Sequence, residues 1–554
     1  MSFICSKIRP SIGEKNMKLV TVSQMQTIEK EADAGGLTYD QMMKNAGLSL
    51  ADIVLGLFIE DDEVEALGLL GPGNNGGDTL VALTALAMEG WKTRAYLVKR
   101  KKDDLLKGFT EAGGEVLSGD KAFEQLAESI ESADVLLDGI LGTGIKLPLK
   151  KDVAELLAEV NDILDGLNEH PLVIAVDCPS GVDCDTGEVA EETIPADLTV
   201  TMAAVKQGLL KLPAFEYAGD LQVVDIGLPG DLASLKDLNT DVAEEDSVSA
   251  LLPERLLDSH KGTFGTALIA AGSVNYTGAV LLAGEAAYRV GAGLVTLAVP
   301  APVHAALAGQ IPEATWVLLP HAMGVVSSNA SEVLMKNIER ATALLIGPGF
   351  GMEATTKEFI ENILSGKSAP KKSTARIGFL HEENEKKEET NDNLPPMVVD
   401  ADGLKLLAQI KGWHTRIPAP AILTPHPGEM AVLTGLSKEE IQENRQSMAG
   451  KYAKDWGHVV VLKGAFTVIA SPDERVTVIP VASPALARAG TGDVLAGLIV
   501  GLRAQGLDAF DAAVAGAWIH AQAGLYAADD LGTTASVLAS DVLNSVPDVL
   551  SDLE

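Results

Sequence analysis

Two series of short apolar runs, each alternating with helical patterns, restrict the fold of this chain more than any other feature. Strands that alternate with helices form βαβ units, so we expect two α/β units with mostly parallel sheets. In the first series the expected strands are 65–71, 93–98, 134–138, 171–177, 198–203 and 221–226, with helices at 77–90 and 151–168 among them. The second series contains the strand-like segments 265–273, 293–300, 342–350, 396–404, 421–429 and 458–466.

A chain of 554 residues is too long for one ordinary core, which agrees with two domains. Residues 228–250 are acidic and rich in turn formers, and they separate the two series. We therefore expect domains at 17–228 and 247–554, joined by a linker at 229–246. Residues 366–396 are mostly charged and polar, and we expect a surface insertion there.

Composition narrows the range of partners and compartments. The formal net charge of −35 argues against nucleic acid, whose phosphates would be repelled. The three cysteines form no CxxC pair and no disulfide framework, which fits a reducing compartment. No segment is apolar enough to span a bilayer, the first residues lack a signal core, and Met17 is an alternative start. We expect a cytoplasmic homo-oligomer that acts on small molecules.

The segment AGTGD at 489–493 precedes a helical pattern that continues as VLAGLIVGL. A Gly-rich helix N-terminus presents free N–H groups to a phosphoryl group, here from Gly490, Thr491 and Gly492. Asp493 follows at once and could take a proton from a substrate hydroxyl. The alternative is a turn whose Asp caps the helix without binding a ligand.

Three expected strands of the first half end in polar, Gly-rich turns, namely 71–78 (GPGNNGGD), 138–144 (DGILGTG) and 177–181 (DCPSG). Ligands collect at the carboxyl ends of strands in an open parallel sheet. Asn75, Asp138 and Ser180 supply oxygen atoms that suit a hard cation. Each acidic residue could instead cap a turn, but three such ends together favour a binding site.

These three segments, with the opening run SQMQTIEKEADAGG, resemble the NAD(P)H-hydrate epimerase family over about residues 17–228. The resemblance implies a Rossmann-like three-layer domain that interconverts the R and S hydrates and binds potassium through Asn75, Asp138 and Ser180. It makes Asp177 the proton-transfer residue, with Lys99 as a weaker candidate partner. The implied hydrate contacts are Asn74, Asn75, Gly76, Gly77, Asp78, Gly142, Thr143 and Gly144.

Eight segments of the second half resemble the ADP- or ATP-dependent NAD(P)H-hydrate dehydratases, which belong to the ribokinase-like α/β superfamily. The segments are HKGTFG at 260–265, GSVNYTGA at 272–279, GAGLVT at 291–296, GPGFG at 347–351, VVDADGL at 398–404, LTPHPGEM at 423–430, KGAFT at 463–467 and AGTGD at 489–493. At 483–485 the sequence Ser-Pro-Ala departs from the Gly-Asn step that is more usual before AGTGD.

The second resemblance implies that Asp493 is the base and that Mg²⁺ accompanies the nucleotide. The implied hydrate contacts are Ala279, Gly349, His426 and Asp493. The implied nucleotide contacts are Lys463, Gly464, Ala465, Phe466, Thr467, Gly490, Thr491 and Gly492.

Together the two halves predict an enzyme that epimerises hydrated NADH and NADPH and dehydrates the S epimer with a nucleotide. The sequence does not decide between ADP and ATP; ADP is the nucleotide we favour. One alternative is a kinase for a small-molecule hydroxyl, because the ribokinase-like fold serves many substrates. Another is a non-catalytic scaffold in the first half, which would not need Asp78, Asp138 and Asp177.

Overall fold

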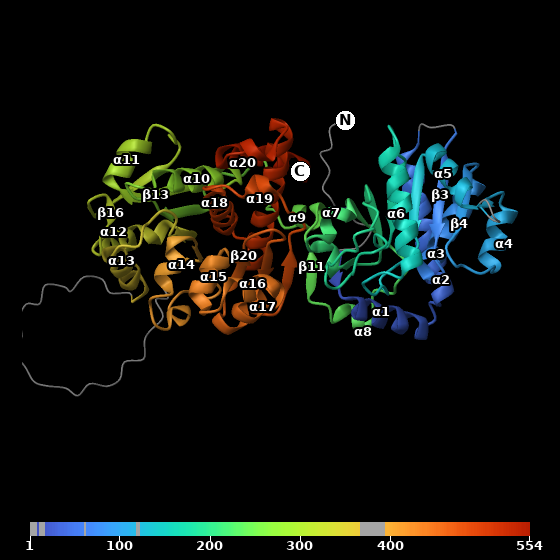
Figure 1. Ribbon diagram of the computed structural model, residues 1–554. Helices are drawn as coiled ribbons and strands as arrows, with labels where there is room; N and C mark the ends of the chain where they lie inside the picture. The colour runs from blue at the N-terminus through green and yellow to red at the C-terminus, as the bar shows by residue number, and fades with distance from the viewer. Residues whose placement is uncertain (1–7, 10–16, 60–62, 118–121, 366–393) are drawn as a thin grey trace, which may run out of the picture. The chain divides into compact units, whose positions relative to one another are not determined.

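The computed structural model describes residues 8–9, 17–59, 63–117, 122–365 and 394–554, which form two compact units (Figure 1). The first unit ends at Glu244 and the second begins at Glu245. Both are α/β units, as the alternation of strand and helix patterns predicts. Within the described ranges, no helix is long and apolar enough to cross a membrane.

The first unit is built on a parallel sheet in the order β10-β8-β7-β6-β3-β4-β5, with β1 beside β10. The chain enters at β3, adds β4 and β5 on one side, and returns to add β6, β7, β8 and β10 on the other. This order places a topological switch point between β3 and β6, where parallel α/β sheets bind their ligands. The strands of the sheet are β1 (Ile8–Arg9), β3 (Glu65–Leu70), β4 (Lys92–Leu97), β5 (Glu115–Leu117), β6 (Val135–Gly139), β7 (Leu172–Val176), β8 (Leu198–Met202) and β10 (Asp220–Val224).

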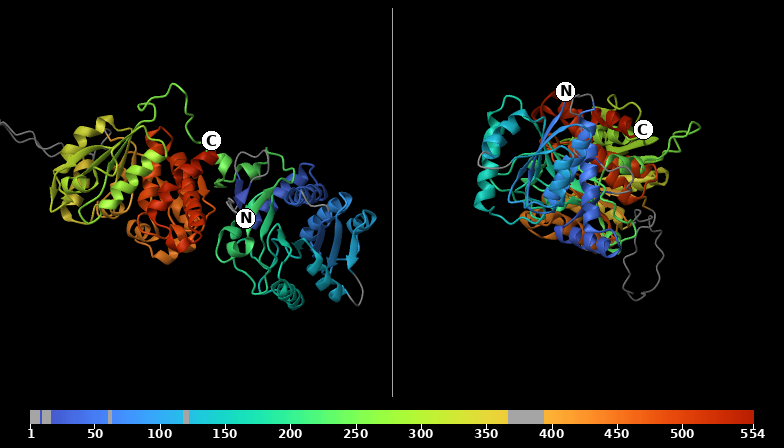
Figure 2. Two further views of the ribbon diagram at one scale, coloured as in Figure 1. Left: turned by 90° about the horizontal axis from the view of Figure 1, so that it is seen from above. Right: turned by 90° about the vertical axis from the view of Figure 1, so that its right-hand side faces the viewer.

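Helices cover both faces of this sheet, so the unit has three layers (Figures 1 and 2). Alternate residues of β3 point to opposite faces: Ala66 and Leu70 belong to the core beneath the first four helices, and Leu67 and Leu69 to the core beneath α5 and α6. The main helices are α1 (Val22–Ala34), α2 (Tyr39–Leu57), α3 (Asn74–Met88), α4 (Asp104–Glu111), α5 (Ala122–Ser132) and α6 (Lys151–Gly166), with a short α7 (Ala214–Ala218).

The segment expected to be a linker is folded, and most of it belongs to the first unit. Within 229–246, α8 (Ala233–Lys236) is capped by the Glu31 carboxylate, which accepts from the N–H groups of Ala233 and Ser234, both at 2.9 Å. β11 (Thr240–Val242) then pairs antiparallel with β2 (Met17–Val20), which pairs with β9 (Val205–Lys206). Leu232 and Leu238 are buried. These two leucines pack into the core of the first unit, although they form no periodic pattern in the sequence.

The second unit contains a sheet in the order β14-β13-β12-β17-β18-β19-β20-β21-β22, parallel from β14 to β20 and antiparallel after it. Its switch point lies between β12 and β17. Its strands are β12 (Thr266–Ala270), β13 (Leu294–Pro300), β14 (Thr315–Leu319), β17 (Ala343–Ile346), β18 (Met397–Val399), β19 (Ile422–Leu423), β20 (Val459–Leu462), β21 (Val468–Ala470) and β22 (Val476–Val478), and β15 (His321–Ala322) and β16 (Val325–Val326) form a separate hairpin.

The helices of the second unit also lie on both faces of its sheet (Figure 1). They are α9 (Glu245–Ser249), α10 (Thr277–Arg289), α11 (Ala301–Leu307), α12 (Ala330–Asn337), α13 (Ala354–Leu364), α14 (Asp402–Leu407), α15 (Pro427–Thr434), α16 (Lys438–Glu443), α17 (Arg445–Trp456), α18 (Thr491–Ala504), α19 (Ala509–Leu531), α20 (Ala539–Asn544) and α21 (Val546–Leu553). Of the expected insertion 366–396, residues 366–393 lie outside the described residues, and Leu394 is buried just before β18.

Helices α10 and α18 pack unusually closely because both present small side chains to each other. A Cβ on Gly497 would lie 2.4 Å from the carbonyl oxygen of Ala283, and one on Gly501 would lie 2.9 Å from the Cα of Ala287. Neither position has room for a methyl group. This contact fixes the place of α18, whose N-terminal turn carries the AGTGD segment.

Candidate active sites

The first candidate site lies at the switch point between β3 and β6. Helix α3 starts at Asn74, earlier than the expected 77, so the Asn74–Asp78 segment forms its first turns and is not a loop. The glycines permit this early start because a Cβ on Gly76 would lie 2.2 Å from the carbonyl oxygen of Gly71. Asn74 is exposed, whereas Asn75 and Asp78 are buried.

Asn75, Asp138 and Ser180 come together here, although they follow three different strands. The Ser180 hydroxyl donates to Asp138 Oδ1 at 2.6 Å, and the Ser180 N–H donates to Asp138 Oδ2 at 2.8 Å. The Leu141 N–H donates to Ser180 Oγ at 2.9 Å, and the Asn75 amide donates to the Leu141 carbonyl at 2.7 Å. All three side chains therefore surround the turn that begins at Gly139.

Three observations bear on the cation site that the sequence predicts at this cluster. Asn75 Oδ1 is buried and lacks a hydrogen-bond partner among the described residues. Burial raises the pKa of Asp138, against the hydrogen bonds from Ser180. Within the described ranges, no three His, Cys, Asp or Glu side chains could hold a metal ion together, so a cation here would need amide and hydroxyl oxygens as well.

Gly142, Thr143 and Gly144 follow in the turn after β6, next to the same cluster. A Cβ on Gly142 would lie 3.3 Å from that of Asn75, so the turn passes directly over α3. A ligand held there would contact backbone rather than large side chains.

Asp177 ends β7 with a left-handed backbone, at a φ of 64°. Its Oδ1 accepts a hydrogen bond from Lys206 Nζ at 2.5 Å. Nearby, burial raises the pKa of Asp78 well above its usual value, and the charges of Asp177 and Glu29 add to this effect. Burial also raises the pKa of Glu29. The site therefore combines one carboxylate paired with an ammonium group and two carboxyls that hold their protons more tightly.

The structure replaces Lys99 with Lys206 as the partner of Asp177. Lys99 forms an ion pair with Asp152 instead, and its side chain is 61% exposed. Lys206 carried no local signal in the sequence, because a lysine next to an apolar strand is usually at the surface. Glu29, in α1, was also missed, because a glutamate in a helix is usually at the surface.

The second candidate site is built at the carboxyl ends of β17, β18, β19 and β20 and the N-terminus of α18. Gly490 is the N-cap of α18 with a φ of 94°, and Asp493 lies in the first turn. The Thr491 hydroxyl donates to the carbonyls of Leu486 and Arg488, at 3.0 and 2.9 Å. The hydroxyl of Thr491 is thus committed to the turn, and the Thr491 N–H donates to the Arg488 carbonyl at 3.4 Å. Among the described residues, the N–H groups of Gly490 and Gly492 make no backbone hydrogen bond, which leaves them for a ligand.

Burial raises the pKa of Asp493 to about 7, and the negative charge of Asp400 adds to this effect while Lys463 opposes it. A carboxyl that titrates near neutrality is well suited to accept a proton from a hydroxyl.

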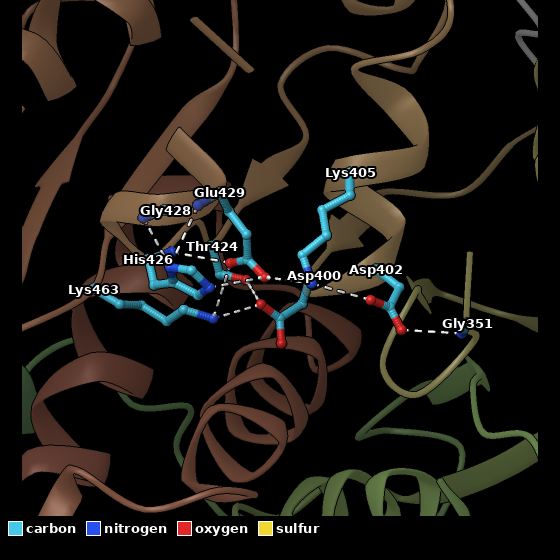
Figure 3. Close-up of polar contacts among 9 residues, drawn as sticks. All are labelled: Gly351, Asp400, Asp402, Lys405, Thr424, His426, Gly428, Glu429 and Lys463. Carbon is cyan, nitrogen blue, oxygen red and sulfur yellow. Dashed lines mark hydrogen bonds and ion pairs between the residues drawn. The ribbon is translucent and has the colours of Figure 1, made fainter. Parts of the chain in front are cut away.

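Lys463 points into a cluster of acidic side chains (Figure 3), and it also interacts electrostatically with Asp493. Its Nζ lies 2.6 Å from Asp400 Oδ1 and 4.0 Å from Glu429 Oε2. Burial alone would lower the pKa of Lys463, but Asp400 and Glu429 outweigh it and raise the pKa. Asp400 also accepts from the Thr424 hydroxyl at 2.7 Å. The ammonium group is therefore a fixed positive charge beside the carboxyl of Asp493.

His426 is the N-cap of α15 (Figure 3). Its Nδ1 accepts from the N–H groups of Gly428 and Glu429, at 2.9 and 3.3 Å. Because Nδ1 accepts, the ring proton of the neutral form lies on Nε2, which is 3.4 Å from Glu429 Oε1. Burial lowers the pKa of His426. The side chain remains 52% exposed, so it can contact a ligand.

Ala279 and Gly349 lie together at the switch point of the second sheet. Gly349 has a φ of 64°, and a Cβ there would lie 3.0 Å from the Cβ of Ala279 and 2.9 Å from that of Tyr276. Gly349 is therefore needed for the close packing of this turn against Tyr276 and Ala279.

The segment from Lys463 to Thr467 forms the loop between β20 and β21. The Thr467 hydroxyl donates to the Gly464 carbonyl at 2.9 Å, and Phe466 has a φ of 53°. Ala465 is exposed between them. Arg445, which the sequence did not single out, lies against Gly464 and donates to the Leu462 carbonyl at 2.8 Å.

The sequence also gave no individual role to Asp400, Asp402, Glu429 or His520. The first three lie inside segments that carried the resemblance, so position within a motif could have found them. His520 lies in the middle of α19, where burial lowers its pKa to about 4.

Each unit is thus an α/β enzyme domain, with carboxylates and Gly-rich turns at the carboxyl ends of its parallel strands. The family profile described as YjeF-related protein N-terminus matches residues 39–208, and the one described as NAD(P)H-hydrate dehydratase matches 267–370 and 378–548.

Among known proteins, the chain is 35% identical to the bifunctional NAD(P)H-hydrate repair enzyme Nnr of Moorella thermoacetica, over 97% of each chain. It is 32% identical to that of Escherichia coli, over 94% of this chain and 92% of that one. A crystal structure of the ADP/ATP-dependent NAD(P)H-hydrate dehydratase from Bacillus subtilis, co-crystallised with ATP and Mg²⁺, aligns with 56% of this chain and 98% of its own, with 30% identity and a TM-score of 0.45. This chain belongs to the family of bifunctional NAD(P)H-hydrate repair enzymes.

Proposed function

We propose that residues 17–244 interconvert the R and S epimers of hydrated NADH and NADPH, and that residues 245–554 dehydrate the S epimer with a nucleotide. The observation that best supports the proposal is Asp493, a carboxyl with a pKa of about 7 at the N-terminus of α18. Family membership supplies the substrate, and the two sites supply the residues. The alternatives of a hydroxyl kinase and of a non-catalytic first half have no observation of their own in their favour.

In the first unit, Asp177 is the proposed proton-transfer residue. The hydrate would lie against the first turns of α3, where Asn74, Asn75, Gly76, Gly77 and Asp78 are found, and against the turn at Gly142, Thr143 and Gly144. Inverting the carbon that bears the hydroxyl requires its C–O bond to break, with a proton donated to the departing hydroxyl so that it leaves as water. A water molecule then adds to the opposite face and gives up a proton to an acceptor. Asp177 and the protonated Asp78 offer an acceptor and a donor on one side of the sheet.

Potassium is the proposed ion of this unit, held by Asn75, Asp138 and Ser180. The unpartnered Oδ1 of Asn75 and the buried Asp138 support this assignment. The ion would supply positive charge to a ligand bound over the turn at Gly142.

In the second unit, Asp493 would take the proton from the hydrate hydroxyl while that oxygen attacks the terminal phosphoryl group of the nucleotide. The N–H groups of Gly490, Thr491 and Gly492 would stabilise the negative charge that develops. The bond between the hydrate carbon and the phosphorylated oxygen then breaks, driven by the ring nitrogen, and a proton leaves the neighbouring carbon. The products are NAD(P)H, inorganic phosphate and the shortened nucleotide.

The other residues of this site would bind the two substrates. Ala279, Gly349 and His426 are the proposed hydrate contacts. Lys463, Gly464, Ala465, Phe466 and Thr467 would line the nucleotide pocket. Mg²⁺, the proposed companion of the nucleotide, would shield its phosphates. ADP is the nucleotide we favour over ATP.

Cytoplasmic localisation and a homo-oligomeric state are also part of the proposal. Cys178 and Cys184 are buried free thiols, which supports a reducing compartment. Sedimentation of the purified chain would test the oligomeric state.

The decisive experiment incubates the full chain with a mixture of both hydrate epimers, with ADP, with ATP or without nucleotide. We expect the near-ultraviolet absorbance of reduced nicotinamide to return only with nucleotide, and to account for both epimers. Recovery that stops when one epimer is consumed would contradict the epimerase half. Phosphorylated hydrate as the final product would instead indicate a kinase.

A further inference from the structure

Lys206 carries a buried ammonium group whose hydrogen-bonding capacity is fully used. The side chain is 1% exposed. Its three donors meet Asp177 Oδ1 at 2.5 Å, the Thr201 hydroxyl oxygen at 3.0 Å and the Met202 carbonyl at 2.8 Å. Burying a lysine is costly unless it is paired and hydrogen-bonded. This arrangement satisfies both conditions at the end of β8 and β9.

The two carboxylate oxygens of Asp177 accept different numbers of hydrogen bonds. Oδ1 accepts from Lys206 and also from the Thr201 hydroxyl at 3.2 Å and the Met202 N–H at 3.1 Å. In the described parts of the chain, no hydrogen bond is made to Oδ2. The carboxylate is 16% exposed, so the oxygen that is not held can be reached from outside.

Other charged and titratable groups face this pair from neighbouring elements. Asp78 in α3 and Glu29 in α1 both interact electrostatically with Asp177 and with Lys206. Arg100 interacts with Asp78. The Cys178 thiol follows Asp177 directly, and its hydrogen bond with Cys184 and its burial raise its pKa. Lys206 is therefore a positive charge common to three carboxyl groups.

We propose that Lys206 is a positioning residue of the first site: it holds Asp177 through Oδ1 and leaves Oδ2 as the oxygen that exchanges a proton with the substrate. This inference rests on the proposed epimerase function. Three fixed contacts on one oxygen remove the rotational freedom of the carboxylate, which is what a proton transfer between two faces of a ring requires.

The test compares the pH profile of epimerisation in the full-length wild type, Lys206→Met and Lys18→Met. Lys206 lowers the pKa of both Asp78 and Glu29, so removing its charge would make these neighbouring carboxyls hold their protons more readily. We expect Lys206→Met to lose about 10²-fold in epimerisation rate and to move the acidic limb of the profile to higher pH. Lys18→Met breaks an ion pair with Asp241 in β11 and should leave both limbs in place.

Thr201→Val provides a milder variant that keeps Lys206 and the side-chain volume. It removes the hydroxyl that bridges Lys206 and Asp177, so we expect a smaller shift of the acidic limb in the same direction. This variant decides the question if Lys206→Met does not fold. Nucleotide-dependent dehydration of the S epimer, measured on the same samples, shows whether the second unit is intact.

An acidic limb that stays in place in both variants would overturn the inference, even if the rate falls, because a purely structural role lowers the rate without moving the limb. Absence of epimerisation in the wild type would instead remove the proposed function itself. The two failures are therefore distinguishable.

Discussion

The raised pKa of Asp493 predicts a specific pH dependence of dehydration. Burial, together with the charge of Asp400, brings the pKa to about 7. A base works only when it is ionised, so activity must fall as pH drops through that value. About a tenth of the Asp493 carboxyls are ionised at pH 6 and about nine tenths at pH 8. Therefore kcat/KM for dehydration should rise about tenfold between these pH values.

The neighbours of Asp493 determine the direction in which this midpoint moves. Lys463 lowers the pKa of Asp493, so Lys463→Met should move the midpoint to higher pH. Asp400 raises it, so Asp400→Asn should move the midpoint to lower pH. Both variants will reduce the rate as well, because both residues lie in the site. Opposite shifts in the midpoint are the expected signature of charge coupling.

The variant Asp493→Asn should lose nucleotide-dependent dehydration. Removing a positioned base commonly costs about 10²–10⁴ in rate, and epimerisation should remain because it depends on the first unit. The same change should stabilise the fold, since the folded state holds the ionised carboxyl unfavourably. The cost begins above the unfolded pKa near 4 and is complete above pH 7, where the linkage amounts to about 4 kcal/mol. Asp530→Asn, on an exposed part of α19, should do neither.

The assay is stopped-flow or steady-state absorbance of restored NAD(P)H, with purified S epimer, saturating nucleotide and buffers from pH 5.5 to 9. Thermal unfolding at pH 5 and pH 8 measures the stability difference. A flat kcat/KM profile between pH 6 and pH 8, or an Asp493→Asn variant that dehydrates at near the normal rate, would refute the assignment of Asp493 as the base.

Three further predictions concern the rest of the chain. Rubidium soaked into crystals should give an anomalous peak among Asn75, Asp138 and Ser180, and Asp138→Asn should abolish stimulation of epimerisation by potassium; a peak elsewhere would contradict the site. Replacing residues 366–393 with a short Gly/Ser link should leave dehydration within a few-fold of the parent, and a large loss would mean that the segment takes part in catalysis. Expressed separately, residues 17–244 should epimerise without nucleotide and residues 245–554 should consume only one epimer, because a site that aligns one hydroxyl with a phosphoryl group holds the other out of line. If the second fragment consumed both epimers at equal rates, epimerisation by the first fragment would not be needed, and the proposed role of the first unit would be contradicted.

The strand and helix patterns were sufficient to predict the class of fold, because the core is formed by regular elements. β3, β6 and β7 lie within a residue or two of their expected bounds. The start of α3 was harder to predict, since a helix with Gly76 and Gly77 in its first turn depends on close packing against Gly71. The short elements within 229–246 could not be predicted for a related reason: α8 is capped by Glu31, which lies 202 residues before Ala233 along the chain.

In the candidate sites too, residues within recognisable sequence segments could be predicted, whereas residues whose role depends on contacts distant in the sequence could not. Asn75, Asp138, Ser180 and Asp493 follow strands or open helices within recognisable segments, so their placement could be predicted. The placement of Lys206 could not be predicted, because its role depends on its contact with Asp177, which lies on another strand end of the sheet. The pKa of Asp493 was also beyond the sequence, since it results from burial and from Asp400, which precedes it by some ninety residues.

The close contact between α10 and α18 has a consequence for how this chain can change over time. A methyl group at Gly497 or Gly501 would meet backbone atoms of Ala283 or Ala287, so no smaller side chain at those two alanines makes room for it, and the helices must move apart. Separation would displace the N-terminus of α18, and with it Asp493. Both positions should therefore remain glycine, and random mutagenesis under selection for dehydration should recover no larger residue at either.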